Sequence, residues 1–285
     1  MNVAICLALG LSTLVPAAPP AAPSDRTVHV TVLDDKREPV PNLTAADLVV
    51  KEGGKEREIV KVERASAPLR VALAVEERMT ADSSVRMALF EFMKRISGSA
   101  EISLITVGLR NTVIVDYTKS LDALVGGING FSLNPAPESS VAEGVLDLAN
   151  RFITSKSARP AIVLIALSGV RGGVDPHHVL ERLGQSGATM NVITLASPLG
   201  APASSETSRG EQVIGDGPRQ SGGRRIDVTQ TAGMPKAILQ VADELLAQYA
   251  VTYTLPDGVK PDRRVNVSLK RRGVQLRAPS IVPDK

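Results

Sequence analysis

The sequence predicts an α/β protein with a doubly wound, mostly parallel sheet, flanked along the chain by β segments. Three observations predict this class. From residue 68 to about 250, short apolar runs alternate with amphipathic segments, as in strands joined by crossover helices. The run at residues 161–167 is apolar throughout, as expected of a strand buried on both faces. Residues 25–67 show a pattern of successive strands that are not separated by long helices, and residues 251–285 show the same pattern.

The first 24 residues contain no charged side chain. Residues 3–15 form an apolar run that is too short to span a bilayer as a helix, and a Pro/Ala-rich stretch follows. This pattern is typical of a secretory signal peptide, although the usual amino-terminal Lys or Arg is absent. We therefore expect residues 1–24 to be a signal peptide and linker. The mature chain is then exported, periplasmic or extracellular, without a transmembrane span; a buried N-terminal strand is the alternative.

Composition excludes several kinds of site. Cys6 is the single cysteine and lies in the predicted signal peptide, so we expect no disulfide, thiolate nucleophile or zinc–thiolate site in the mature chain. Aromatic residues make up only 2% of the chain and tryptophan is absent. Platforms for sugars or single-stranded nucleic acid depend on exposed aromatic rings. We therefore expect no nucleic-acid partner.

The N-terminal β segment, residues 25–67, begins with the alternating run Val28-x-Val30-x-Val32. A polar turn at residues 34–39 ends this strand. Two further candidate strands, residues 48–51 and 57–62, flank Gly53-Gly54, which is a hairpin signal.

The α/β pattern begins after Pro68 and is expected to extend over residues 68–250. The turn at residues 108–111 is too short for a crossover, so the strand at 112–117 is predicted to pair antiparallel, at an edge of the sheet. The Gly-, Ser- and Pro-rich residues 197–223 are interpreted as a long mobile loop. The remaining predicted strands are 70–76, 101–107, 161–167, 189–195 and 224–228, and the helices are 81–97, 120–127, 140–153, 175–184 and 234–248.

The C-terminal β segment, residues 251–285, has candidate strands at 250–254, 264–269 and 274–278. Isolated hairpins are marginal in water. The two β segments are therefore expected to pair into one small sandwich into which the α/β domain is inserted; two separate appendages are the alternative. The same segment has eight Lys or Arg against three Asp, either a solvated strand face or a basic surface for an anionic partner.

Several segments, in this order, resemble one known family. They are Val30–Asp34 with the turn at Val40–Leu48, the strand at Leu69–Val75, Gly222-Gly223-Arg224, and Gln248–Thr254. Together they resemble a von Willebrand factor A-type domain, and more closely the exported bacterial A-domain-related family common in acidobacteria-like genomes. The resemblance implies a Rossmann-type sheet that serves protein binding or cell adhesion.

Such domains usually carry a metal-ion-dependent adhesion site, in which oxygen ligands hold Mg²⁺. An Asp-x-Ser-x-Ser loop follows the first strand, a Thr precedes a middle helix, and an Asp follows the fourth strand. The positions that correspond in this chain are Glu76, Arg78, Thr80, Ser139 or Ser140, and Ser168.

A guanidinium offers no lone pair and repels a dication, so the resemblance with these residues implies a degenerate site without metal or other cofactor. A non-standard Mg²⁺ site with Glu77 as substitute ligand is the alternative. Arg78 is expected either to fill the vacated space by pairing with Glu76 or Glu77, or to point into solvent.

No catalytic constellation is recognisable. His177 and His178 are adjacent on a predicted helix and cannot both face one metal ion. Glu101, Glu138 and Glu143 do not form an evident acid/base pair, and no complete Gly-x-Ser-x-Gly turn is present. We therefore expect a non-enzymatic, exported interaction or adhesion module whose partner is another envelope or extracellular protein.

The predicted contact surface consists of residues 76–80, 131–140 and 168–175, where this topology places its binding crevice. Within it, the predicted partner-binding residues are Glu76, Glu77, Arg78, Thr80, Ser139, Ser140 and Ser168. Three other functions remain open. One is an Mg²⁺-dependent adhesin, and another is a structural envelope scaffold that assembles through its β segments or basic tail. The third is an enzyme, which would require a buried acid/base pair in the crevice.

Overall fold

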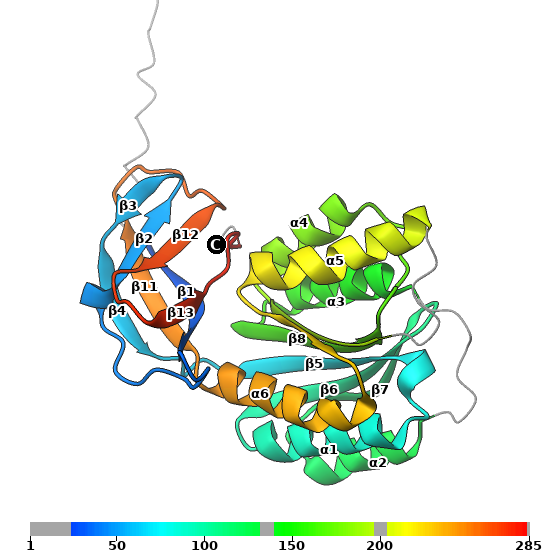
Figure 1. Cartoon of the computed structure of the whole chain (residues 1–285). Helices are drawn as coiled ribbons and strands as arrows, with labels where there is room; N and C mark the ends of the chain where they lie inside the picture. Colours follow the sequence, from blue (N-terminus) through cyan, green and yellow to red (C-terminus); the bar gives the residue numbers. More distant parts are fainter. Residues whose placement is uncertain (1–23, 132–139, 197–203, 284–285) are drawn as a thin grey trace, which may run out of the picture.

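A computed structural model describes residues 24–131, 140–196 and 204–283 of the chain. The predicted signal peptide, up to residue 23, lies outside the described residues. Within the described residues, no helix combines the length and the apolar character needed to cross a bilayer. Figure 1 shows two units, an α/β domain and a β-sandwich that lies at one end of the central sheet of that domain.

The α/β domain is built on a six-stranded sheet in the order β10-β9-β8-β5-β6-β7. Neighbouring strands are parallel except at the edge, where β7 runs antiparallel to β6. The sheet confirms the predicted fold class and the antiparallel edge strand after the short turn. The strands are β5 (Leu69–Glu76), β6 (Ala100–Val107), β7 (Asn111–Thr118), β8 (Arg159–Leu167), β9 (Thr189–Leu195) and β10 (Arg225–Val228).

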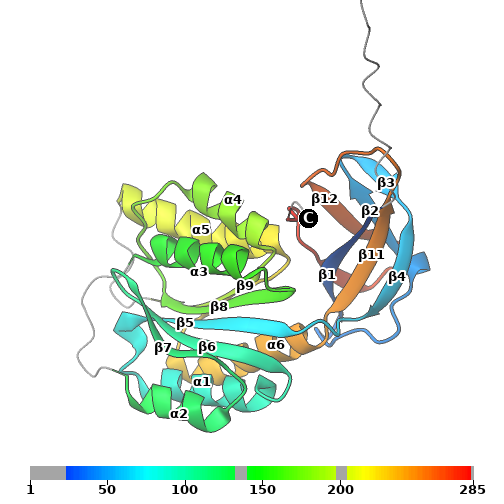
Figure 2. The ribbon, with the colours of Figure 1, turned by 180° about the vertical axis from the view of Figure 1, so that it is seen from behind.

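Helices cover both faces of this sheet, as Figures 1 and 2 show. One face carries α1 (Ser83–Ile96), α2 (Leu121–Asn129) and α6 (Met234–Leu246), and the other carries α3 (Val141–Ser155), α4 (Pro176–Ser186) and α5 (Ser205–Ser221). Strand β5 contributes to both cores: Val71 and Leu73 belong to the first, and Ala72 and Ala74 to the second. Burial on both faces explains why this strand is an unbroken apolar run in the sequence.

The two flanking β segments pair with each other in one sandwich. In one sheet, β1 (Ser24–Asp34) lies between β11 (Tyr249–Leu255) and β13 (Val274–Arg277), and β4 (Ile59–Arg64) pairs with β11. In the other, β2 (Leu48–Glu52) lies between β12 (Val265–Leu269) and β3 (Lys55–Arg57). Val30, Val50 and Val251 belong to their shared core. Of the two arrangements that the sequence left open, the sandwich with an inserted α/β domain is observed.

Arg159 fixes the joint between the two units. Its buried guanidinium donates hydrogen bonds to the Ala65 carbonyl (3.1 Å), to the side-chain oxygen of Gln248 (3.1 Å) and to the Leu245 carbonyl in the last turn of α6. Ala65 follows β4 and Gln248 precedes β11, so both chain connections are held by one side chain. Burial lowers the pKa of Arg159 to about 10.

The predicted mobile loop over residues 197–223 is wrong, because α5 occupies most of that segment. Ser204 caps the helix, with its Oγ accepting the N–H of Thr207 at 3.1 Å. A glycine that indicated a loop instead allows close packing: a Cβ on Gly210 would lie 2.2 Å from the Val170 carbonyl oxygen. Composition therefore misled the prediction, since small residues serve here as contact points between helix and backbone.

The predicted hairpin at Gly53-Gly54 is present but short. Strands β2 and β3 pair across the two glycines, which both have positive φ and thus suit a tight hairpin turn. The second predicted arm divides at Glu58: β3 stays with β2, whereas β4 pairs with β11 in the opposite sheet. This segment therefore contributes to both sheets of the sandwich.

Candidate functional site

The carboxyl ends of the parallel strands form one end of the α/β domain, which we call the crest. We define it as residues 76–80, 108–111, 140–143, 168–175 and 204–206. It lies at the opposite end of the sheet from the sandwich (Figure 1). In open α/β sheets this end is where ligands bind. Of the residues predicted to bind a partner, all but Ser139 are described, and each of these lies in the crest.

An ion pair between Glu76 and Arg78 occupies the position predicted from the sequence. Glu76 ends β5, and its side chain is 0% exposed. The short turn η2 (Glu77–Met79) follows, and Arg78 Nε donates to Glu76 Oε1 at 2.5 Å while a terminal nitrogen of the guanidinium contacts the same oxygen. Glu76 Oε2 accepts the N–H of Leu167 at 2.7 Å. Of the two orientations left open, the Arg78 side chain is turned toward Glu76.

The two neighbouring predicted residues also make contacts within the protein. Thr80 is buried, and its hydroxyl donates to the Glu77 carbonyl at 2.8 Å. The Glu77 carboxylate lies against the β6–β7 turn, because a Cβ on Gly108 would lie 2.2 Å from Glu77 Oε2. Gly108 therefore leaves the space in which this carboxylate sits.

The predicted serines lie at two other parts of the crest. The N–H of Ser140, just before α3, donates to the Gly108 carbonyl at 2.9 Å. The N–H of Ser168, just after β8, donates to the Leu195 carbonyl at 2.7 Å. Both side chains are partly exposed. Ser139, the alternative to Ser140, lies outside the described residues.

These contacts do not fit a divalent metal ion held by Glu76. Mg²⁺ requires oxygen ligands at about 2.0–2.1 Å in near-octahedral geometry. Both oxygens of the Glu76 carboxylate already accept hydrogen bonds from the protein, and a guanidinium lies where the ion would have to approach. The guanidinium supplies no lone pair and would repel the ion. Binding a metal here requires Arg78 to move away from a buried carboxylate.

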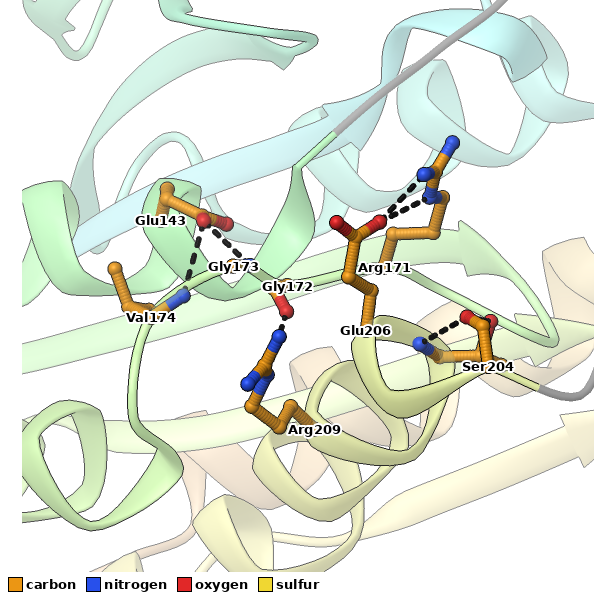
Figure 3. Close-up of polar contacts among 9 residues, drawn as sticks. Glu143, Arg171, Gly172, Gly173, Val174, Ser204, Glu206 and Arg209 are labelled. Carbon is orange, nitrogen blue, oxygen red and sulfur yellow. Dashed lines mark hydrogen bonds and ion pairs between the residues drawn. The ribbon is translucent and has the colours of Figure 1, made fainter.

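A second set of polar contacts joins the segment after β8 to α3 and α5 (Figure 3). Glu143 Oε1 accepts the N–H groups of Gly173 (2.6 Å) and Val174 (3.2 Å). Arg171 pairs with Glu206 in the first turn of α5, at 2.5 Å. Segments distant in sequence are thus held together within the crest.

Leu109 is the exposed apolar side chain of the crest. It lies in the β6–β7 turn and is 65% exposed. Two hollows of about 310 and 170 Å³ adjoin it, and both are lined by Leu109, Ser140 and Glu143. Exposed Arg110 lines the larger hollow and the Arg171–Glu206 pair lines the smaller one.

Leu109 and Glu206 were not among the residues predicted to bind a partner. A signal for Leu109 was present, because an apolar residue in a turn after a buried strand is solvent-facing unless another segment covers it. Glu206 was not considered because the segment that forms α5 was predicted to be a loop. A polar Ser204 followed by Glu206 and later by the apolar pair Val213-Ile214 is a helix-start pattern that the glycine content obscured.

No family model matches the chain, and no curated protein matches it. Solved structures with a similar fold include an aerotolerance-related membrane protein from Bacteroides fragilis, 15% identical over 62% of this chain and 98% of that one, with a TM-score of 0.46. A von Willebrand factor type A structure from Catenulispora acidiphila is 11% identical over 94% of this chain and 75% of that one, with a TM-score of 0.47.

Proximal thread matrix protein 1 from the mussel byssus is also similar, with 11% identity over 66% of this chain and a TM-score of 0.48. The match spans about half of that protein, 49% of its chain. At these identities and TM-scores the likeness concerns the fold alone.

Proposed function

We propose that this chain is a non-enzymatic interaction module that binds another protein through side chains of the crest, without a metal ion. The exposure of Leu109 between two hollows carries this proposal. Interfaces gain most of their affinity from a few apolar or aromatic anchors surrounded by polar groups. Leu109 beside Arg110 and Glu143 has this composition.

Metal independence is supported by the Glu76–Arg78 pair. With its carboxylate already occupied, this position contributes no open coordination site for a partner's acidic side chain. Glu76 and Thr80 are buried, so we assign them the role of shaping the crest. Glu77, Arg78, Ser140 and Ser168 are partly exposed and are proposed to contact the partner around Leu109.

The proposed compartment is the periplasm or the extracellular space, and the partner is then an envelope or extracellular protein. This part of the proposal rests on the uncharged, apolar N-terminal segment and on the absence of cysteine after residue 6. After removal of the proposed signal peptide the chain has no thiol that an oxidising compartment could oxidise.

The proposed surface predicts the effect of a charge at Leu109. We expect Leu109→Asp to weaken binding to the native partner by about tenfold or more, because the charge would have to be desolvated in the interface. Val60→Asp is the matched control, since Val60 is 49% exposed on β4 of the sandwich. Partner proteins captured from an envelope extract by the wild-type chain are identified, and their affinity for each variant is measured with and without EDTA.

We expect Leu109→Asp to lose affinity for the partner, Val60→Asp to retain it, and EDTA to leave it unchanged. Loss with Val60→Asp alone would instead favour a scaffold that assembles through the β segments. Loss in EDTA would favour the metal-dependent adhesin.

A further inference from the structure

A cavity of about 960 Å³ lies between the α/β domain and the sandwich. Its walls are the end of α5, the start of β10, strand β13 and the turn after β1. Because β10 begins here and the crest lies where the parallel strands end, the cavity and the crest are at opposite ends of the sheet. The cavity therefore belongs to neither the predicted nor the proposed contact surface.

Backbone contacts hold the two walls of this cavity together. The N–H of Ser280, after β13, donates to the Gln220 carbonyl in α5 at 2.8 Å. Gly222 packs directly against the other unit, since a Cβ there would lie 2.8 Å from the backbone of Ala278 and Pro279. The cavity therefore lies beside a closely packed, hydrogen-bonded interface between the two units.

Five arginines line the cavity, two from the sandwich and three from the α/β domain. They are Arg37, Arg219, Arg224, Arg225 and Arg277. Two of them pair with nearby carboxylates. Arg219 pairs with Asp216, and Arg225 pairs with Glu211 and Asp227, both at 2.7–2.8 Å. Asp227, the carboxylate among the lining residues, is thereby engaged, and it also accepts a hydrogen bond from Thr194.

Two of the remaining three arginines share one carboxylate. Glu244 of α6 accepts Arg224 at one oxygen (2.8 Å) and Arg277 at the other (2.7 Å), and it is almost fully buried. Within the described residues no ion pair of the Arg37 side chain is found. Arg37, Arg224 and Arg277 with Glu244 therefore carry three positive charges and one negative.

The neighbouring positive charges affect the pKa of Arg224. Burial lowers the pKa of the Arg224 guanidinium, and the positive charges of Arg277 and Arg37 lower it further, against the opposing effect of Glu244. Arg224 Nε is also buried without a hydrogen-bond acceptor in the part of the chain that is described. Clustered guanidiniums of this kind are stabilised when an anion neutralises them.

We propose that this cavity binds a small molecule bearing a dianionic phosphate group, held between Arg37 and Arg277 of the sandwich and Arg224 of the α/β domain. Against four paired carboxylates the five arginines leave the cavity one net positive charge. The excess lies on the group of Arg37, Arg224 and Arg277, and it is opposite in sign to the charge of a phosphate ester near neutral pH. Guanidinium forks match phosphate oxygens bidentately. The volume exceeds that of a phosphate group alone, so the cavity leaves room for a larger molecule that carries the phosphate. Binding bridges both units and stabilises their joint.

Pyrophosphate serves as the probe, with citrate and sodium chloride at matched ionic strength as comparisons. Calorimetric titration measures affinity, and thermal unfolding measures stabilisation. Arg37→Asn is the test variant: Arg37 has a φ of 65°, and Asn tolerates this left-handed conformation well. Arg272→Asn is the charge-matched control, because Arg272 is exposed on the sandwich and does not line the cavity.

We expect pyrophosphate to bind the wild-type chain and raise its unfolding temperature. Arg37→Asn should lose about tenfold or more in affinity, the scale of one charge-assisted contact, and Arg272→Asn less than about twofold. Without ligand, Arg37→Asn should unfold at the wild-type temperature or above. Absence of pyrophosphate binding, equal losses in both variants, or tighter binding of citrate would overturn the proposal.

Discussion

The variant Arg78→Met is expected to unfold about 2–3 kcal/mol more easily than the wild-type chain. Removing the guanidinium leaves the Glu76 carboxylate fully buried and without its ion-pair partner, while the Leu167 N–H still donates to it. Breaking a buried pair by removing one partner typically costs about 3–5 kcal/mol. We expect somewhat less here because the Arg78 side chain is 32% exposed, so water can reach part of the site. Chemical denaturation at neutral pH measures the difference.

A double variant separates the buried charge from the loss of packing. In Glu76→Gln combined with Arg78→Met, the amide oxygen still accepts the Leu167 N–H and no charge is buried. We therefore expect the double variant to recover most of the stability lost in Arg78→Met. Additive losses would show that the two side chains are not coupled.

The variant Arg159→Met is expected to lose about 2–4 kcal/mol of stability. Three hydrogen bonds from a charged donor disappear, and the half-buried carbonyl of Ala65 and the buried carbonyl of Leu245 are left without this partner. The desolvation cost of the wild-type guanidinium, visible in its lowered pKa, offsets part of this loss. The contacts join both chain connections, so unfolding of the sandwich and of the α/β domain should become less cooperative. Calorimetry and chemical denaturation measure both effects.

Arg95→Met is the matched control for Arg159→Met. Arg95 pairs with Asp243 between α1 and α6, and both side chains are about half exposed. Exposed ion pairs contribute about 0–1 kcal/mol, so this variant should remain close to the wild-type chain. A loss in Arg159→Met no larger than in Arg95→Met would contradict the role assigned to Arg159.

Much of the fold was predictable because its signals are local. Unbroken apolar runs marked β5 and β8, and the turn at residues 108–111 was too short for anything except an antiparallel edge strand. The sandwich was predictable only as one of two options. No local pattern decides whether β1 pairs with β11, because the paired residues are more than 200 positions apart in the sequence.

Other features could not be predicted from the sequence, because the same residue type has different structural roles in different surroundings. The glycines of α5 allow close packing rather than flexibility, as Gly210 demonstrates. The Glu76–Arg78 pair was one of two equal alternatives, because spacing alone does not fix a side-chain direction. The basic C-terminal segment was left open as a surface for an anionic partner, but a cavity shared with the α/β domain was not predicted. Arg37, Arg224 and Arg277 are far apart in the sequence and meet only through the packing of two units.

Thermal unfolding with and without Mg²⁺, Mn²⁺ and Ca²⁺ shows whether Arg78, rather than a metal ion, holds the Glu76 carboxylate. Each ion is added at millimolar concentration and compared with a sample in EDTA. We expect the same unfolding temperature in every case. A rise with any one ion would contradict it, since a bound ion at a hundredfold excess over its Kd adds about 2.7 kcal/mol.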